Sequence, residues 1–136
     1  MIIDKPLLDN LTSQAKSSPR LRMNYDLRNN PEDHSQRMLN ALEPGTVMPI
    51  HRHRNSSETV VVLRGKVKWL FYDDNGNLID SFIVEASGDL CGLNVPQGQW
   101  HSLECLESGS VIFEAKDGAW EPLAEEDIIE TYNNPK

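Results

Sequence analysis

The stretch Gly45–Glu58 reads GTVMPIHRHRNSSE and holds three side chains that can bind a metal ion. His51 and His53 are separated by one residue, and Glu58 follows after the polar residues RNSS. If both histidines lie on one strand, their imidazoles point to the same face, because side chains alternate along a strand. An antiparallel neighbouring strand that opens at Glu58 brings its carboxylate to the same space. Imidazole and carboxylate together favour a divalent transition metal.

A fourth ligand has to come from a distant part of the chain, and His101 is the candidate. It lies in VPQGQWHSL, where a Pro-Gly turn precedes a predicted strand. His34, the remaining histidine, lies in a polar loop and is left out. Glu58 has an alternative role, since a carboxylate can hydrogen-bond a histidine ligand without touching the metal. The predicted metal ligands are His51, His53, Glu58 and His101.

Length, hydrophobic content and net charge narrow the classes of protein to which this chain can belong. The chain has 136 residues, of which 38% are hydrophobic, and this suits one domain with a single core. The formal net charge is -8 and no basic run stands out, which argues against nucleic acid as a partner. The N-terminus lacks the pattern of a signal peptide, and no apolar run reaches the ~20 residues that span a bilayer. We expect a soluble cytoplasmic protein with no membrane partner, in which Cys91 and Cys105 are reduced and buried.

The pattern along the chain predicts one helix followed by many short strands. Residues 4–16 predict an amphipathic helix that Asp4 caps and Pro6 begins, and residues 28–36 predict a polar loop. From residue 37 onward, β-branched and aromatic runs alternate with turns, which is typical of an antiparallel sandwich or barrel. Asn75-Gly76 separates two such runs and predicts a hairpin with a two-residue turn. The acidic stretch AEEDIIETY, at residues 124–132, favours one or two helical turns.

Two motifs of the chain resemble those of the cupin superfamily. The first is glycine, five residues, His-x-His, four residues, glutamate, six residues and glycine, and the stretch from Gly45 to Gly65 matches it at every position. The second has the core P-x-G-x-x-H, which Pro96–His101 matches. Leu90 stands where the second motif has its leading glycine, and Cys105 stands where it has an asparagine. Neither departure removes a metal ligand.

A wider resemblance, over about residues 18–120, is to the WbuC-type cupin-fold metalloproteins. The stretches SPRLRMNYDLR, SQRMLNALEPGT and HRHRNSSETVVVLRG carry it. It implies an all-β protein, a single cupin jelly-roll β-barrel with its core at about residues 37–116. The N-terminal segment 1–36 with its short helix packs on the barrel, and a short helical tail follows it. The resemblance also implies one divalent metal bound by the four predicted ligands, and a homodimer, because cupins often pair.

The N-terminal segment contains candidate substrate-binding residues. If it folds over the barrel mouth, its arginines hold a carboxylate or phosphate of the substrate; the alternative is a solvated edge. Glu104 and Glu114 face the cavity in one strand register and solvent in the other, because a one-residue slip reverses the faces. Tyr72 and Trp100 are assigned to core packing. The candidate substrate-binding residues are Arg20, Arg22, Asn24 and Tyr25.

The resemblance implies a small metalloenzyme that acts on a polar small molecule, such as a sugar or sugar-nucleotide of surface-polysaccharide synthesis. The metal is expected to be zinc, iron, manganese or nickel, and the reaction a metal-dependent isomerisation or a dioxygenase-type oxidation. No catalytic residue is assigned. The alternative is a non-catalytic module that binds or senses a small molecule through its metal. A metal-free cupin epimerase with a histidine base is disfavoured by the complete set of four ligands.

Overall fold

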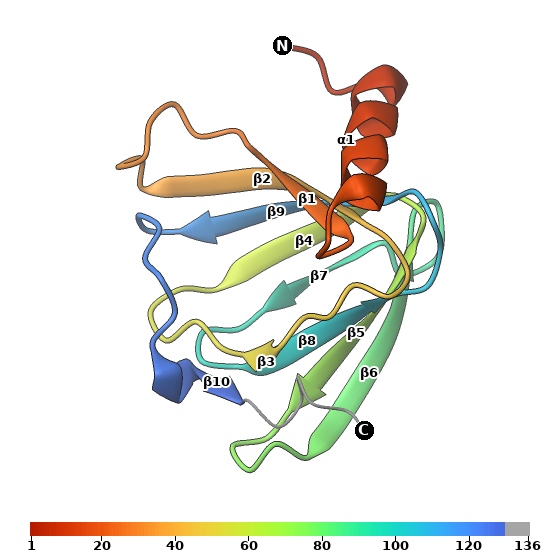
Figure 1. The fold of residues 1–136 in the computed structure, drawn as a ribbon. Helices are drawn as coiled ribbons and strands as arrows, with labels where there is room; N and C mark the ends of the chain where they lie inside the picture. Colours follow the sequence, from red (N-terminus) through yellow and green to blue (C-terminus); the bar gives the residue numbers. More distant parts are fainter. Residues whose placement is uncertain (130–136) are drawn as a thin grey trace.

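The computed structural model describes residues 1–129 and shows two five-stranded antiparallel sheets that face each other (Figure 1). The first sheet consists, in spatial order, of β1 (Arg22–Asp26), β2 (Ser35–Leu42), β9 (Ser110–Asp117), β4 (Glu58–Arg64) and β7 (Gly92–Val95). The second consists of β10 (Ile128–Ile129), β3 (Ile50–His51), β8 (Trp100–Cys105), β5 (Lys66–Tyr72) and β6 (Leu78–Glu85). Successive strands repeatedly change sheet, which confirms the predicted cupin jelly roll.

The inward-facing side chains, which are every second residue along a strand, form an apolar core between the sheets. In β4 the burial alternates residue by residue, so Val60 and Val62 point inward while Val61 and Leu63 stay partly exposed. This period of two is what a strand with one buried face requires. The inner cluster combines residues of both sheets: Leu42, Val60, Val62, Val67, Trp69, Val84, Val95, Leu103, Cys105 and Ile112.

The N-terminal helix α1 (Lys5–Ser17) covers part of the outer face of the first sheet (Figure 1). As predicted, the side chain of Asp4 caps the helix, and its Oδ1 accepts a hydrogen bond from the backbone N–H of Leu7 at 3.1 Å. Leu11 and Ala15 lie on its buried face. They pack against Leu39, Ala41 and Val111, on the outer faces of β2 and β9. The helix therefore buries the apolar outer face of β2 and β9.

The hairpin predicted at Asn75-Gly76 joins β5 to β6, but its turn is longer than the two residues expected. Asp73 N–H donates to the carbonyl of Asn77 at 2.9 Å, and the carboxylate of Asp73 accepts the N–H groups of Asn75 and Asn77. Gly76 has a φ of 82°, which glycine adopts without strain. The side chain of Asp73 stabilises the longer loop, because its carboxylate accepts hydrogen bonds from two backbone N–H groups of the loop.

Two other predictions need correction. β1 lies within a stretch for which no strand was predicted, and Leu27 N–H also pairs with the carbonyl of Arg37. At the other end, the helical tail is reduced to one 3-10 turn at Glu125–Asp127, and Ile128–Ile129 form β10 beside β3. Pairing with a neighbouring strand has outweighed local helix preference in this segment. The rest of the predicted tail lies outside the described residues.

The two cysteines are free, as predicted, although Cys91 is exposed and only Cys105 is buried. Within residues 1–129, no helix has the length and apolar character needed to cross a membrane.

Candidate metal centre

Three histidines come together inside the barrel. His51 on β3 and His101 on β8 are direct partners in the register of these two strands. The candidate ligand atoms of His51, His53 and His101 all lie within 4.8 Å of one another. The expectation that His51 and His53 share a strand is wrong, because β3 ends at His51 and His53 lies in the following loop.

Contacts on both sides hold His53 in place without a strand. The His53 carbonyl accepts the N–H of Gly98, in the PQG turn, at 2.8 Å. The neighbouring side chains Arg52 and Arg54 each donate from Nε to Asp127 Oδ1, at 2.9 and 2.6 Å. Asp127 is almost fully buried and directly precedes β10. The two contacts therefore attach the His-x-His segment to the residues just before this strand. No local sequence pattern predicts this contact, because Asp127 lies more than seventy residues away from both arginines.

Glu58 reaches the histidines from the opposite sheet. It is the first residue of β4 and pairs with Val95 and Lys116 in the first sheet, whereas β3 and β8 belong to the second. Its Oε1 lies 3.1 Å from His101 Nε2 and 3.5 Å from His53 Nε2. The expectation that Glu58 lies on a strand next to the histidines is therefore wrong, although its carboxylate does reach them.

Two backbone carbonyls fix the tautomers of His51 and His101. Nδ1 of His51 is 2.9 Å from the carbonyl of Pro49, and Nδ1 of His101 is 2.8 Å from the carbonyl of Gln99. A carbonyl oxygen only accepts hydrogen bonds, so each Nδ1 carries the hydrogen and each Nε2 carries a free lone pair. The same second partner is common for histidines that bind metals.

Burial keeps all three imidazoles neutral. Loss of hydration lowers the pKa of His51 to about 3, with a further contribution from His101. It lowers the pKa of His53 to about 2, helped by the ammonium of Lys116, and the pKa of His101 to about 4. At neutral pH, the short contacts to Glu58 are therefore not ion pairs.

The donor set fits a bound cation. His101 Nε2 and Glu58 Oε1 are 3.1 Å apart, yet in this tautomer both atoms are hydrogen-bond acceptors. Two lone pairs that face each other at this distance repel, and a shared cation removes the repulsion. Neutral imidazoles with one carboxylate suit a divalent transition metal. The part of the site shown by this geometry is a three-histidine cluster consistent with metal binding.

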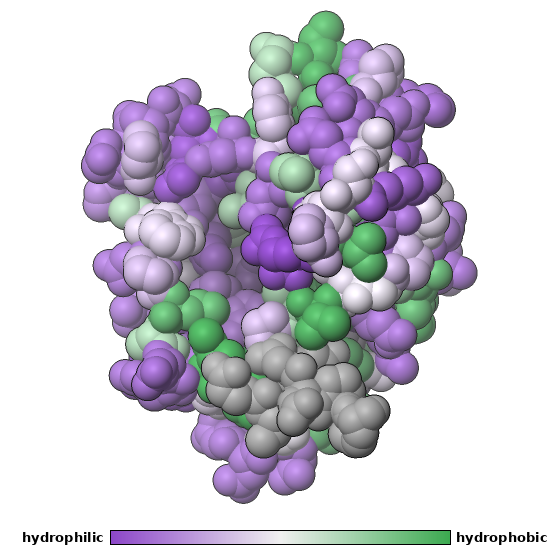
Figure 2. Space-filling model, viewed as in Figure 1, coloured by the Kyte–Doolittle hydropathy of each residue, from purple (hydrophilic) through white to green (hydrophobic). Residues whose placement is uncertain are grey.

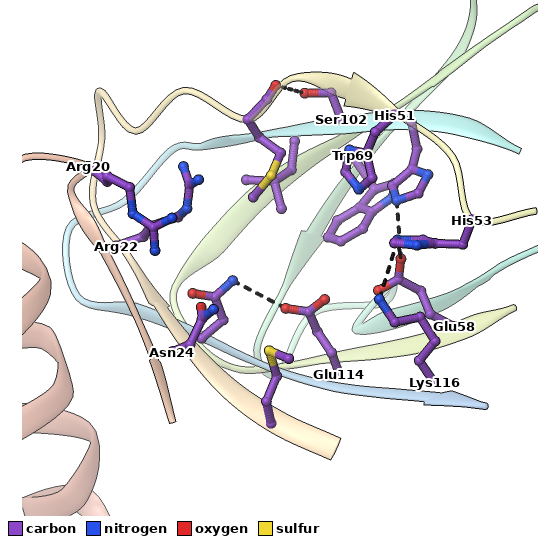
Figure 3. Close-up of a pocket in the computed structure, with 15 residues that line it drawn as sticks. Arg20, Arg22, Asn24, His51, His53, Glu58, Trp69, Ser102, Glu114 and Lys116 are labelled. Atoms are coloured by element: carbon purple, nitrogen blue, oxygen red, sulfur yellow. Dashed lines mark hydrogen bonds and ion pairs between the residues drawn. The ribbon is translucent and has the colours of Figure 1, made fainter. Parts of the chain in front are cut away.

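The histidines form one wall of a cavity of about 190 Å³ (Figure 3). Figure 2 shows that this face of the molecule is hollowed, with hydrophilic side chains inside the hollow and hydrophobic ones along part of its rim. Glu114 faces this cavity, and Asn40 donates to its Oε2 at 3.2 Å. Burial, with a smaller contribution from the Glu58 carboxylate, raises the pKa of Glu114. Lys116 Nζ lies 3.4 Å from His53 Nε2.

Three of the four candidate substrate-binding residues line this cavity. Arg22 and Asn24 are two apart on β1 and point inward, and Arg20 precedes the strand (Figure 3). Tyr25 is exposed and lies on the opposite face of β1, so it is not part of the cavity wall. The role of these residues in substrate binding stays a prediction.

The strand register shows where the side chains of Glu104, Tyr72 and Trp100 point. Glu104 pairs with Lys68, and Trp100 with Tyr72, on the outer face of the second sheet, so none of these lines the cavity. Tyr72 and Trp100 belong to an outer apolar cluster with Ile50 and Leu70.

Sequence reasoning missed Lys116 and Asn40 as cavity residues. The alternation in SVIFEAK places Ile112, Glu114 and Lys116 on one face, which was the available signal. The pattern alone did not say whether that face points inward.

Two facing antiparallel sheets with a histidine cluster between them define a cupin-fold protein. The chain belongs to the family described as "Domain of unknown function (DUF6016)", whose model matches residues 3–84, more than half of the sequence. No curated protein matches the sequence.

Solved structures show the same fold at low sequence identity. KdgF from Halomonas sp. is 15% identical with a TM-score of 0.58, and the match covers 74% of this chain and 82% of KdgF. The capsular polysaccharide assembling protein CapF from Staphylococcus aureus is 23% identical with a TM-score of 0.66, over 82% of this chain and 32% of CapF. Oxalate oxidase, in complex with the substrate analogue glycolate, is 18% identical with a TM-score of 0.63, over 79% of this chain and 56% of the enzyme. This chain thus spans about a third of CapF, and these matches establish the fold alone.

Proposed function

We propose that this protein is a small cupin metalloenzyme of the WbuC type that binds one divalent transition metal through His51, His53, His101 and Glu58. The observation that carries the proposal is the convergence of ligand atoms: those of the three histidines lie within 4.8 Å of one another, and Glu58 Oε1 lies 3.1 Å from His101 Nε2, whose ring carries its hydrogen on Nδ1. Four protein ligands leave coordination positions for a substrate oxygen, provided that the metal takes five or six ligands. The metal would be zinc, iron, manganese or nickel.

A metal bound there would polarise a carbonyl or hydroxyl oxygen of the substrate, or acidify a bound water. The remaining chemistry falls to residues of the cavity wall. Glu114 is the buried carboxyl group beside the proposed ligands, and Asn40 orients it by donating to one oxygen. Burial raises the pKa of Glu114, as does a hydrogen bond that it shares with Glu58, and its carboxyl group would move a proton to or from a ligand in the cavity. Trp69 stacks on His101, with 10° between the ring planes, and helps to fix that imidazole.

The proposed substrate is a small polar molecule, for instance the sugar part of an intermediate in surface-polysaccharide synthesis. The WbuC-type resemblance supports this class, and so does the fold shared with a protein named for capsular polysaccharide assembly. The cavity limits the size of what it encloses, because its volume is only about 190 Å³. A sugar-nucleotide would therefore place only its reacting end inside, with the rest in the mouth of the barrel.

Metal analysis of protein purified without a chelator or a metal-affinity tag tests the proposal. We expect about one metal per chain in the parent and in His34→Ala, because His34 is exposed and lies outside the cluster. We expect little metal in His101→Ala. Equal occupancy in His101→Ala and His34→Ala, or no metal in the parent even after titration, would reject the metal site. Metal-dependent ligand binding without turnover would reassign the protein to the binding modules.

A further inference from the structure

Two of the seven arginines have no carboxylate partner among the described residues. The other five each form an ion pair with a carboxylate within residues 1–129. The two without such a pair are Arg20 and Arg22. In a chain with 21 acidic residues and a net charge of -8, this absence calls for a physical reason. The pairs of the other five are Arg28–Asp26, Arg37–Asp33, Arg52–Asp127, Arg54–Asp127 and Arg64–Asp9.

Neutral oxygen atoms hold Arg22 in place. Its Nη1 donates to the carbonyl of Val47 at 2.8 Å and to Thr46 Oγ1 at 3.3 Å. Thr46 is buried, and its hydroxyl donates to the carbonyl of Arg20 at 2.7 Å. These contacts fix one edge of the guanidinium of Arg22 and leave its other N–H groups without a partner in the described chain.

The arrangement is electrostatically unfavourable without an anion. Partial burial lowers the pKa of Arg22, and the neighbouring charge of Arg20 lowers it further. Two like charges held together at a cavity, with one of them half-buried, repel each other. A bound anion would convert this repulsion into attraction.

The two arginines lie across the cavity from the histidines. Figure 3 shows Arg20, Arg22 and Asn24 at one side of the cavity, and His51, His53 and Glu58 at the other. A molecule that fills the cavity therefore meets guanidinium groups at one end and the histidine cluster at the other.

We propose that Arg20 and Arg22 bind an acidic group of the ligand, whose opposite end places a hydroxyl or carbonyl oxygen at the histidine cluster. The ligand class is thus a small anion, with a carboxylate or a phosphate at one end. Guanidinium groups bind both with charge-assisted hydrogen bonds, which are stronger than those between neutral groups. This inference names the ligand class of the proposed function and rests on that function for the metal at the histidine cluster.

Three probes with the same carbon frame test the charge requirement: glycerate, glycerol 3-phosphate and glycerol. Their affinities are measured by calorimetry on the metal-loaded parent and variants. We expect at least one of the two anions to bind about tenfold or more tightly than glycerol, and the tighter one identifies the acidic group. Added salt should weaken the anion and leave glycerol unaffected.

Arg20→Gln is the decisive variant, because its side chain makes no hydrogen bond or ion pair within residues 1–129 that folding would lose. We expect Arg20→Gln to lose about tenfold or more of the anion affinity. Arg22→Gln should lose at least as much, although it also releases Thr46 and Val47. Arg28→Gln, at an arginine paired with Asp26 away from the cavity, is the matched control and should bind like the parent.

Metal content, measured on the same samples, separates this proposal from the proposed function. Arg20→Gln with an unchanged metal content and a reduced anion affinity supports the anion site. If the parent binds no metal, the proposed function fails, yet anion titration of the metal-free protein still tests the arginines. The proposal is overturned if the three probes bind the parent equally, if neither anion binds at millimolar concentration, or if Arg20→Gln binds as Arg28→Gln does.

Discussion

His51 and His101 face each other as register partners on adjacent strands, and their ring centroids are 4.3 Å apart. Each ring has its Nδ1 within hydrogen-bonding distance of the carbonyl two residues earlier in the chain. The backbone therefore sets both tautomers, and both Nε2 lone pairs are available to a metal before any metal binds. Because folding already orients these two imidazoles, metal binding does not have to order them, and this favours tight binding of the metal.

Glu58→Gln tests whether the carboxylate stabilises the bound cation. The substitution keeps the shape of the side chain but removes its charge, next to His101 and His53. We expect metal affinity to fall by about 10–100-fold or more, since even partners outside the coordination shell contribute that much. Competition with a chromogenic chelator gives the affinity. Glu104→Gln, on the outer face of the barrel, is the control, and a Glu58→Gln affinity equal to that of the control would remove Glu58 from the site.

Asp127→Ala tests the tie that positions His53. Without the carboxylate, Arg52 and Arg54 lose their shared acceptor, and the loop that carries His53 loosens. We expect about a tenfold loss of metal affinity with the fold retained, because Asp127 does not touch the proposed metal position. Asp117→Ala, at the end of β9, should keep the parent affinity. A parent-like affinity in Asp127→Ala would show that the strand pairing alone positions the loop.

The metal-free protein should lose stability in acid through its histidines. An unfolded histidine has a pKa of about 6.5, and the folded values are about 3, 2 and 4. Below pH 6.5 the unfolded chain therefore binds more protons than the folded one, so the free energy of unfolding falls as the pH falls. The slope is at most about 1.4 kcal/mol per pH unit for each histidine. Urea titrations in chelator at a series of pH values measure it.

His101→Gln is the control for this pH dependence, and its curve should be flatter by about one proton below pH 6.5. Glu114 contributes with the opposite sign, because its pKa is raised by burial and by Glu58. Its contribution is present below the ordinary carboxyl pKa and is lost as the pH rises through the raised value. Glu114→Gln should remove the loss of unfolding free energy that occurs as the pH rises from the ordinary carboxyl pKa through the raised pKa of Glu114. Parallel curves for the parent and His101→Gln would contradict the neutral, buried state of this imidazole.

Gly65→Ala should destabilise the fold more than an alanine at another left-handed glycine. Gly65 has a φ of 90°, and a Cβ there would lie 2.7 Å from the Cα of Ser110. Gly118 has a φ of 84°, but nothing lies within 4 Å of its Cβ position. Gly118→Ala therefore costs only the backbone strain of about 1–3 kcal/mol, and Gly65→Ala adds the steric clash. Chemical denaturation of both variants compares them, and equal losses would mean that the backbone at Ser110 moves aside.

We propose a homodimer, and β6 at the edge of the second sheet supports it. Leu78, Ile79 and Ile83 on this strand are exposed. An edge strand with exposed apolar side chains offers both backbone groups and apolar area to a second copy. We expect sedimentation to give twice the chain mass for the parent and for Glu104→Gln, and the mass of one chain for Ile83→Lys. A parent with the mass of one chain at micromolar concentration would reject the dimer.

The amino-acid sequence alone predicts most of the local elements and the residues of the histidine cluster. Asp4 and Pro6 marked the start of α1, the alternation in TVVVLRG marked β4, and Asn75-Gly76 marked the turn between β5 and β6. These features depend on residues that are close in the chain, so their periodicity and turn chemistry are visible without a structure. The spacing of His51, His53, Glu58 and His101 likewise matches the two cupin motifs and predicts that these residues meet.

How these parts meet in space could not be predicted from the sequence. Glu58 reaches the histidines from the opposite sheet, His53 is held by a loop tied to Asp127, and Arg20 and Arg22 lie across the cavity. β10 formed where local preference favoured a helix. Each of these outcomes depends on sheet order and strand register, which are set by hydrogen bonds and packing between residues far apart in the chain. A period of two shows which side chains share a face, but only the closed barrel determines which face points inward.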